Sequence, residues 1–176
     1  MPEEMEPFGK GYALWLTPQE PMFSLLAGEI SRLSQAYSTP RFDPHVTLLS
    51  GITAPEEDAV ARSASLAGRL KPFRIELGEI DYLDEYFRCL FVSVIPTDPI
   101  LKAHLSAREA FGLQDETAYL PHLSLIYGKL GIETKKGIAA RLGSLPGQEF
   151  EVRGLVLYRV RGALREWKCL EKFNLR

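Results

Sequence analysis

The sequence is poor in cysteine and contains no long apolar run. Its only two cysteines, Cys89 and Cys169, lack C-x-x-C spacing, so neither a secreted disulfide framework nor a cysteine-rich zinc site is expected. No apolar stretch approaches the ~18 residues of a membrane span. The first ten residues are acidic and lack an apolar segment. We therefore expect a cytoplasmic protein with free thiols and no membrane association.

An excess of charge of one sign is also missing. The net charge is −2, so the chain has no broad basic field, and long nucleic acid is not an expected partner. A phosphate group would have to be held by a local site. The length of 176 residues suits one compact domain, or two small lobes that share a core. We expect a monomer without a cofactor.

The hydrophobic pattern alternates helices with short strands. Helical spacing predicts helices over 18–37, 53–70, 98–111 and 133–142, the first two capped by Thr17 and Thr53. Extended runs predict strands over 11–16, 73–83, 86–96, 150–160 and 165–175, besides the two segments that contain His45 and His122. Because short turns join strand pairs, we expect an α+β fold of two pseudo-symmetric lobes. Each lobe is expected to have a small, mainly antiparallel sheet with outer helices.

One internal repeat stands out. The segment FDPHVTLLSG, residues 42–51, recurs as YLPHLSLIYG, residues 119–128, with a constant offset, since 122 − 45 = 77 and 128 − 51 = 77. Side chains alternate between the two faces of a strand, so His45 shares a face with Thr47, and His122 shares one with Ser124. Each copy is therefore apolar behind and presents an imidazole and a hydroxyl in front.

The two copies together provide groups for phosphoryl chemistry. An imidazole has an ordinary pKa of about 6.5, so near neutral pH one histidine can act as a base while the other is an acid. Hydroxyl groups donate hydrogen bonds to anionic oxygens without adding charge. One copy of the motif alone is weak evidence for catalysis, because a histidine on a strand usually has a structural role. The recurrence of the polar face at a constant offset favours a central cleft in which His45 and His122 are catalytic and Thr47 and Ser124 bind phosphate.

Other kinds of site fit the sequence less well. A zinc site needs further ligands, but His104 lies in a predicted helix, and Asp43 and Asp115 have no counterpart in the other copy. A serine nucleophile would require a G-x-S-x-G context that is missing. A non-catalytic phosphate-binding module would be better served by arginine or lysine than by two histidines. A metal-independent reaction is the expectation that remains.

The paired H-x-[ST] motifs resemble those of the two-histidine phosphoesterase superfamily. The segments YALWLTP, FDPHVTLLSG, YFRCLFV, YLPHLSLIYG and LVLYRV, followed by Trp167, are most similar to its cyclic phosphodiesterase family. This resemblance covers nearly the whole chain and implies a single bilobal domain over residues 1–176. It also implies hydrolysis of nucleoside 2′,3′-cyclic phosphates or of ADP-ribose 1″,2″-cyclic phosphate.

The same resemblance implies roles for individual residues. It makes His122 the base that activates water and His45 the acid that protonates the leaving oxygen. Trp15 and Tyr127 match aromatic residues beside the ligand, where a base could stack on them. Strict alternation places Tyr127 on the face opposite Ser124, so a bulge or a strand end would have to turn it. The alternative is that both aromatic residues belong to the core.

Related enzymes that act on RNA ends supply the alternative function. Members that resemble RNA 2′,3′-cyclic phosphodiesterases or 2′,5′-RNA ligases usually have an arginine shortly after the second motif, whereas this chain continues SLIYGKL. That difference favours a small cyclic nucleotide as substrate over an RNA end. Charged residues in loops and on exposed strand faces are usually just solvated. Five basic residues are nevertheless candidates for a local basic rim around the site: Arg88, Lys129, Arg159, Arg161 and Arg165.

Overall fold

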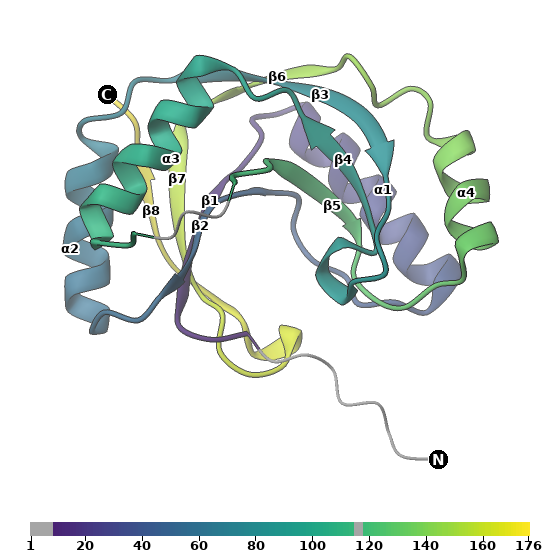
Figure 1. The fold of residues 1–176 in the computed structure, drawn as a ribbon, viewed down its shortest axis with the longest axis horizontal. Coiled ribbons are helices and arrows are strands. Elements are labelled where there is room, and N and C mark those ends of the chain that lie inside the picture. Colours follow the sequence, from purple (N-terminus) through teal and green to yellow (C-terminus); the bar gives the residue numbers. More distant parts are fainter. Residues whose placement is uncertain (1–8, 115–117) are drawn as a thin grey trace.

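A computed structural model describes residues 9–114 and 118–176 (Figure 1). The helices are α1 (Met22–Tyr37), α2 (Glu56–Ala67), α3 (Asp98–Phe111) and α4 (Ile132–Arg141). The strands are β1 (Tyr12–Leu16), β2 (Val46–Ile52), β3 (Phe73–Asp81), β4 (Leu90–Val94), β5 (His122–Ile126), β6 (Glu149–Val152), β7 (Gly154–Arg159) and β8 (Lys168–Asn174). Two short 3-10 turns are also present: Tyr86–Arg88 and Leu164–Glu166.

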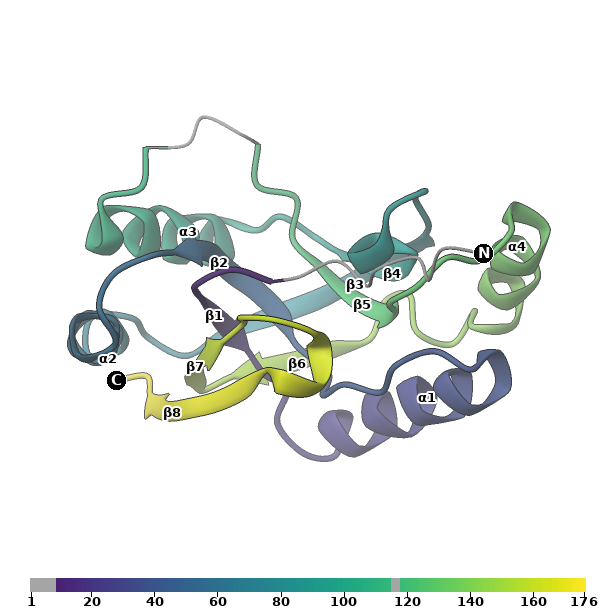
Figure 2. The same cartoon turned by 90° about the horizontal axis from the view of Figure 1, so that it is seen from below.

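The eight strands form one sheet in the order β6-β3-β4-β5-β2-β1-β7-β8, and neighbouring strands are antiparallel. The sheet curls into a half-barrel, with α2 and α3 beside one half and α1 and α4 beside the other (Figures 1 and 2). The α+β class is therefore confirmed, but the prediction of two separate small sheets is wrong. The two halves meet at β2 and β5, where a single residue pair, Val46 with Leu123, joins them.

Each half of the sheet draws on both halves of the sequence. Strand β3 comes early in the chain but pairs with β4 and β6, whereas the late strands β7 and β8 extend the sheet beyond β1. The helices cross over in the same way, since α1 packs against β5 and α3 packs against β2. The two halves of the sheet are thus interlocked. The sequence had instead suggested two lobes, each built from consecutive segments of the chain.

The first helix begins four residues later than predicted. Pro21 disfavours a helical conformation of the residue before it, so the helix cannot run from Thr17 through this position. Glu20 takes over the capping function, because its carboxylate accepts hydrogen bonds from the backbone N–H and the Oγ of Ser24 at 3.2 and 2.9 Å. The N-cap position of α2 is Pro55 and not the predicted Thr53, and no side-chain capping hydrogen bond is made from it.

Two predicted strands are shortened or divided. The predicted strand over 150–160 breaks at Arg153, because β6 joins β3 at one end of the sheet while β7 joins β1 near the other. The predicted strand over 86–96 starts only at Leu90, since Tyr86–Arg88 forms a 3-10 turn. This turn takes Phe87 and Arg88 out of the sheet and toward the cavity described below.

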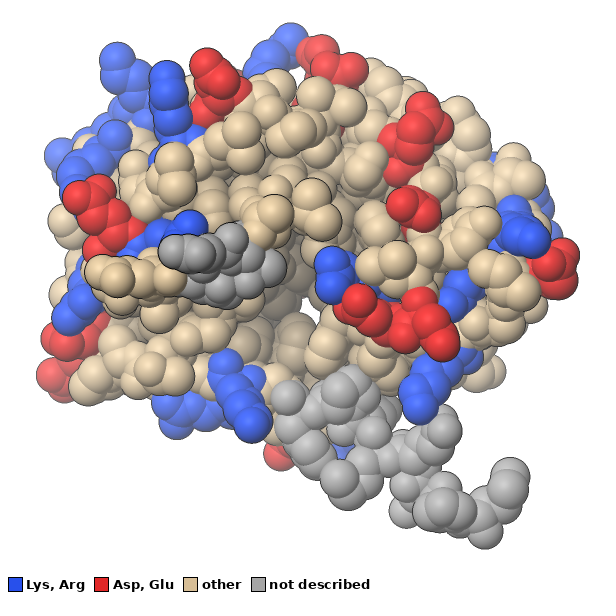
Figure 3. Space-filling view, viewed as in Figure 1, with Lys and Arg blue, Asp and Glu red and all other residues tan. Residues whose placement is uncertain are grey.

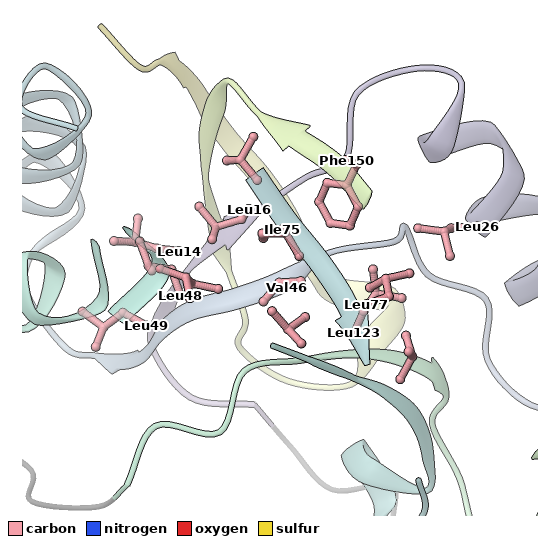
Figure 4. Close-up of a cluster of buried hydrophobic side chains, with 14 of the residues drawn as sticks. Leu14, Leu16, Leu26, Val46, Leu48, Leu49, Ile75, Leu77, Leu123 and Phe150 are labelled. Carbon is pink, nitrogen blue, oxygen red and sulfur yellow. The ribbon is translucent and has the colours of Figure 1, made fainter. Parts of the chain in front are cut away.

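The core lies between the sheet and the helices (Figure 4). Helix α1 buries Leu26, Ile30 and Leu33, which recur at helical spacing and so lie on one face of the helix. The apolar residues predicted behind the two histidine motifs are all buried: Val46, Leu48, Leu123 and Leu125. Burying one such side chain contributes roughly 1.5–3 kcal/mol, so packing behind the motifs holds β2 and β5 in place.

Candidate active site

Strands β2 and β5 bring the two copies of the repeat together in the middle of the sheet. Val46 pairs with Leu123, and these residues are themselves equivalent in the repeat, since 123 − 46 = 77. Along an antiparallel pair, one further step places each histidine opposite the hydroxyl residue of the other copy. All four polar side chains line one cavity of about 370 Å³: His45, Thr47, His122 and Ser124. This cavity is also lined by Phe87 and Arg88 of the first 3-10 turn and by Trp167, which follows the second. Figure 3 shows the surface hollowed in the middle of this face.

The two imidazole rings are held in the same way. The Nδ1 of His45 lies 2.7 Å from the carbonyl oxygen of Asp43, and the Nδ1 of His122 lies 2.9 Å from that of Leu120. A carbonyl oxygen only accepts hydrogen bonds, so Nδ1 carries the hydrogen in both rings and Nε2 is the nitrogen left for chemistry. The proline between each carbonyl and its histidine restricts the preceding residue to extended backbone, which explains its recurrence in the motif.

The two rings differ in their exposure to water. His45 is only 4% exposed and stacks on Trp15, with ring centroids 3.5 Å apart and planes 7° from parallel. Burial lowers the pKa of His45 to about 4, although its hydrogen bond to a backbone carbonyl opposes the shift. His122 is less buried, and its pKa is also lowered by burial, to which the charge of Arg88 adds. Both rings are therefore neutral at pH 7 in the free protein.

Matching β-bulges occur in the two copies of the motif. Ile126 and Ser124 pair with consecutive residues of β4, so Leu125 is the extra residue; Leu49 and Thr47 likewise pair with consecutive residues of β1. The bulge and the end of β5 at Ile126 together turn Tyr127 into the cavity, as its predicted role requires. Its Oη lies 3.4 Å from the Nε2 of His45. Burial raises the pKa of Tyr127, so the phenol stays protonated.

Trp15 and Tyr127 support His45 more than they offer faces to a ligand. Trp15 lies between His45 and Tyr158, whose ring is 3.7 Å away on a stacked contact, and so both of its faces are covered. Tyr127 stacks on Phe42 at 3.9 Å. Both residues line the cavity, but each is about 5% exposed or less. A base cannot stack on Trp15 without displacing one of these rings.

Two aromatic residues at the rim were missed as site residues in the sequence. Phe87 and Trp167 are half-buried, line the cavity and lie 5.6 Å apart between ring centroids. Phe87 belongs to a segment that reads as a strand, and nothing in its spacing indicates a 3-10 turn. These rings, rather than the covered ring of Trp15, are the aromatic surfaces nearest to solvent.

The two hydroxyl groups are in different states. The Oγ of Ser124 donates a hydrogen bond of 2.9 Å to the carbonyl oxygen of Phe87. No such bond is found between the Thr47 hydroxyl and any described residue. Thr47 can therefore bind a phosphoryl oxygen directly, whereas the Ser124 hydroxyl has to turn away from its carbonyl to do so.

The third histidine lies outside this cavity and supports β2. The Nδ1 of His104, on α3, is 2.8 Å from the carbonyl oxygen of Leu48, the bulged residue. The ring of His104 stacks on Tyr119 at 3.9 Å, and the Tyr119 hydroxyl donates to the carbonyl oxygen of Thr47. Both contacts fix the backbone beside Thr47.

Of the five basic residues considered for a rim, Arg88 alone lines the cavity. Lys10, which was not among the five, lines it as well. Arg88 is paired with Glu85 at 2.7 Å. Arg159 instead pairs with Glu56, and Arg161 lies over the ring of Tyr12. The two others, Lys129 and Arg165, are not among the lining residues.

The described part of the chain contains neither a cluster of metal ligands nor a disulfide. Within residues 9–114 and 118–176, no three His, Cys, Asp or Glu side chains gather closely enough to hold a metal ion. Asp115, weighed as a ligand, lies outside the described residues. Cys89 and Cys169 are both free thiols. None of the described helices is long and apolar enough to cross a membrane.

The amino-acid sequence is similar to those of known proteins over most of its length. The profile of the 2′-5′ RNA ligase superfamily matches residues 22–163. A cyclic phosphodiesterase of Arabidopsis thaliana is 27% identical over 174 residues, which cover 93% of this chain and 94% of that protein. A 2′,3′-cyclic-nucleotide 3′-phosphodiesterase of Yarrowia lipolytica is 27% identical over 210 residues, which cover 91% and 97% of the two chains.

Among solved structures, LigT of E. coli has a similar fold. Its apo form superposes with a TM-score of 0.63 and 14% identity, over 96% of this chain and 99% of LigT. Other LigT structures contain 3′-AMP, ATP or NADP+. At this identity the likeness concerns the fold alone.

Proposed function

The chain belongs to the 2′-5′ RNA ligase superfamily, and on this premise we propose that it hydrolyses a nucleoside 2′,3′-cyclic phosphate, or ADP-ribose 1″,2″-cyclic phosphate, to a phosphomonoester. The carrying observation is that two imidazoles with their Nδ1 atoms held by carbonyl groups line one cavity with two hydroxyl residues. The names of the Arabidopsis and Yarrowia relatives support the same reaction class.

The reaction balances with the groups present. One neutral histidine takes a proton from water through Nε2, and the water oxygen forms a bond to phosphorus. The bond from phosphorus to one ribose oxygen breaks in line with the attack, and the second histidine, protonated at Nε2, gives its proton to that oxygen. The hydroxyls of Thr47 and Ser124 donate to the non-bridging oxygens as charge builds there. The product is a monoester with a free ribose hydroxyl.

The resemblance assigns the base to His122 and the acid to His45, and we propose the same roles. Because His45 is the more deeply buried ring, its proton has to be stabilised by the incoming phosphate anion, which raises the pKa of both rings. The Tyr127 oxygen can also accept a hydrogen bond from the protonated Nε2 of His45.

The remainder of the substrate fits a nucleoside. Phe87 and Trp167 offer half-buried aromatic surface at the rim, and base stacking on an aromatic ring contributes ~1–3 kcal/mol. Lys10 and Arg88 line the same cavity, and no carboxylate is among its described lining residues. A small anionic nucleotide is therefore the substrate that we propose.

The experiment that tests this proposal uses uridine 2′,3′-cyclic phosphate with excess chelator, followed by phosphorus NMR. We expect conversion to a single monoester by the wild-type protein, and no comparable conversion by a His45→Ala, His122→Ala double variant. Binding without turnover would leave a non-catalytic binding module as the function. Turnover confined to an oligonucleotide that ends in a cyclic phosphate would favour an RNA-end enzyme, and activity abolished by chelator would indicate a metal.

A further inference from the structure

A buried lysine on α4 takes no part in the reaction described so far. Lys135 lies near the start of this helix and is only 4% exposed. A lysine is almost never fully buried unless its ammonium group is paired, because removal of the charge from water is costly. The start of a helix adds to this cost, since the positive end of the helix dipole lies there. Any advantage of a lysine at this position therefore lies in the contact that its ammonium group makes.

That contact is with the backbone of the loop between β3 and β4. The Nζ of Lys135 donates a hydrogen bond of 2.7 Å to the carbonyl oxygen of Leu83. The backbone N–H of Leu83 in turn donates to the carbonyl oxygen of Arg88 at 3.0 Å. We call residues 82–89 the rim loop. Leu83 thus connects α4 to the part of the rim loop that lies at the cavity.

The rim loop supplies two side chains to the histidine cavity, those of Phe87 and Arg88. The loop is also held from β5, because the Oγ of Ser124 donates a hydrogen bond of 2.9 Å to the carbonyl oxygen of Phe87. That contact fixes the backbone of the loop at Phe87, and the contact of Lys135 fixes it at Leu83. The position of both cavity residues therefore depends on a donor from α4 as well as on one from β5.

The repeated fold does not itself require this lysine. At the offset of the two motifs, the position equivalent to Lys135 is Asp58 on α2, since 135 − 58 = 77. The side chain of Asp58 is 58% exposed and pairs with Arg62 of the same helix at 3.6 Å. The helix that follows the first motif thus forms without a buried charge at this position. This difference supports a role of Lys135 in the rim loop rather than in the packing of a helix.

We propose that Lys135 is a positioning residue of the active site, which holds the rim loop so that Phe87 and Arg88 stand at the cavity. Lys135 is not among the residues that line the cavity, and the rings of His45 and His122 are held by carbonyl groups outside the loop. Loss of the contact should lower the fraction of molecules whose loop is in place, which weakens ligand binding and spares proton transfer. Only this effect on binding rests on the proposed function.

The variant Lys135→Met tests the contact without any substrate. It keeps an unbranched apolar side chain and removes the ammonium group, while the carbonyl of Leu83, a residue that is 37% exposed, can turn to water. Replacement of a buried charge by an apolar side chain is often neutral or stabilising, so the melting temperature should not fall. Hydrogen exchange followed by NMR should nevertheless be about fivefold faster at the Leu83 amide, the equivalent of one net hydrogen bond.

The matched control is Ile138→Val on the same helix. Ile138 is 1% exposed and belongs to the core, so this variant should lower the melting temperature. Because it leaves the ammonium group in place, exchange at the Leu83 amide should stay as in the wild type. Lys135→Arg keeps a buried cation that can donate to the Leu83 carbonyl, and it should retain part of the protection.

Steady-state kinetics on uridine 2′,3′-cyclic phosphate extend the test to the active site. Lys135→Met should raise KM about fivefold, in line with the exchange result, while kcat changes little. Ile138→Val should match the wild type in both constants despite its lower melting temperature. In a Phe87→Ala background, Lys135→Met should raise KM by a smaller factor, because one of the side chains that it positions is already missing.

Exchange at the Leu83 amide as slow in Lys135→Met as in the wild type would overturn the proposal. So would faster exchange with an unchanged KM, or an equal rise in KM with and without the Phe87 ring. A wild-type protein that hydrolyses no cyclic phosphate would overturn the proposed function instead. The exchange rates of the three variants would still decide whether Lys135 holds the rim loop.

Discussion

The hydroxyl of Tyr119 donates a hydrogen bond of 2.9 Å to the backbone carbonyl of Thr47. This contact exists because β2 and β5 separate after the single pair Val46–Leu123, so the next carbonyl groups of β2 have no ladder partner in β5. Tyr119 and His104 take up two of these acceptors from the side of α3 and the segment before β5. Where β2 and β5 separate, two side chains thus supply the hydrogen-bond donors that the missing ladder would have supplied.

We expect Tyr119→Phe to weaken the site without removing any group that touches the substrate. The variant leaves the Thr47 carbonyl without a protein donor, which should cost about 1–3 kcal/mol of stability if water cannot reach it. Because one of the contacts that position Thr47 is lost, kcat should fall more than KM rises. Tyr82→Phe, at a residue that follows β3, is the control for loss of a phenol. Unchanged kcat in Tyr119→Phe would show that the contact is only structural.

Removal of either cavity histidine should nearly abolish turnover. A proton-transfer group contributes ~10² to 10⁴ in rate, so His45→Ala and His122→Ala should each lower kcat on uridine 2′,3′-cyclic phosphate by that factor. The double variant should lose less than the product of the two, because the groups act together. Melting temperatures measured for all variants check that they are folded.

The acid and the base can be separated with a better leaving group. Catechol cyclic phosphate releases a phenoxide, which needs little help from an acid. His45→Ala should therefore lose much less activity on this compound than on the nucleotide, whereas His122→Ala should lose equally on both. The reverse pattern would exchange the two roles.

The pH dependence of kcat/KM should be a bell that lies at acidic pH. The free protein is active only with one of the two rings protonated, and the pKa of each ring is below the ordinary 6.5, that of His45 at about 4. We expect the maximum between pH 4 and about 6.5, with a fall of about tenfold per pH unit at higher pH. The profile of kcat should lie at higher pH, because bound phosphate favours protonated rings. A maximum of kcat/KM above pH 7 would contradict the burial argument.

Burial of His45 also has a consequence for stability. Its pKa is about 4 in the folded protein and about 6.5 when unfolded, so the unfolded chain binds more protons between these values. The stabilisation is complete above pH 6.5 and is lost as the pH falls toward 4, by about 3 kcal/mol. Urea unfolding at pH 7 and pH 4 should therefore show a larger loss in the wild type than in His45→Gln. Equal losses in the two proteins would argue against a desolvated ring.

Local chemistry could be predicted from the sequence because it is repeated in the sequence. Alternation and the offset of 77 placed His45, Thr47, His122 and Ser124 on inward faces, and the structure brings all four to one cavity. The family followed from the same motifs. A bulge or strand end before Tyr127 could also be predicted, because strict alternation places this residue on the face opposite Ser124.

Long-range pairing could not be predicted from the sequence. The pairing of β3 with β4 followed from the short turn between them, but periodicity does not tell that β3 also pairs with β6 from the second half of the chain. Nor does it tell that one run of extended residues divides at Arg153 between opposite ends of the sheet. The rim residues were missed for a related reason. Phe87 alternates as a strand residue would, and only the 3-10 turn takes it to the cavity.

The rim leads to a prediction about the nucleobase. If the base lies against Phe87 and Trp167, then Phe87→Ala or Trp167→Ala should raise KM by about five- to a hundredfold while kcat changes little, in proportion to ~1–3 kcal/mol of stacking. The decisive control is a substrate without a base, such as the 2,3-cyclic phosphate of 1-O-methylribose. Both variants should match the wild type on this compound, because it has nothing to stack. An equal loss with and without the base would mean that these rings act by holding His45 and its aromatic neighbours in place, and the base would then have to lie elsewhere.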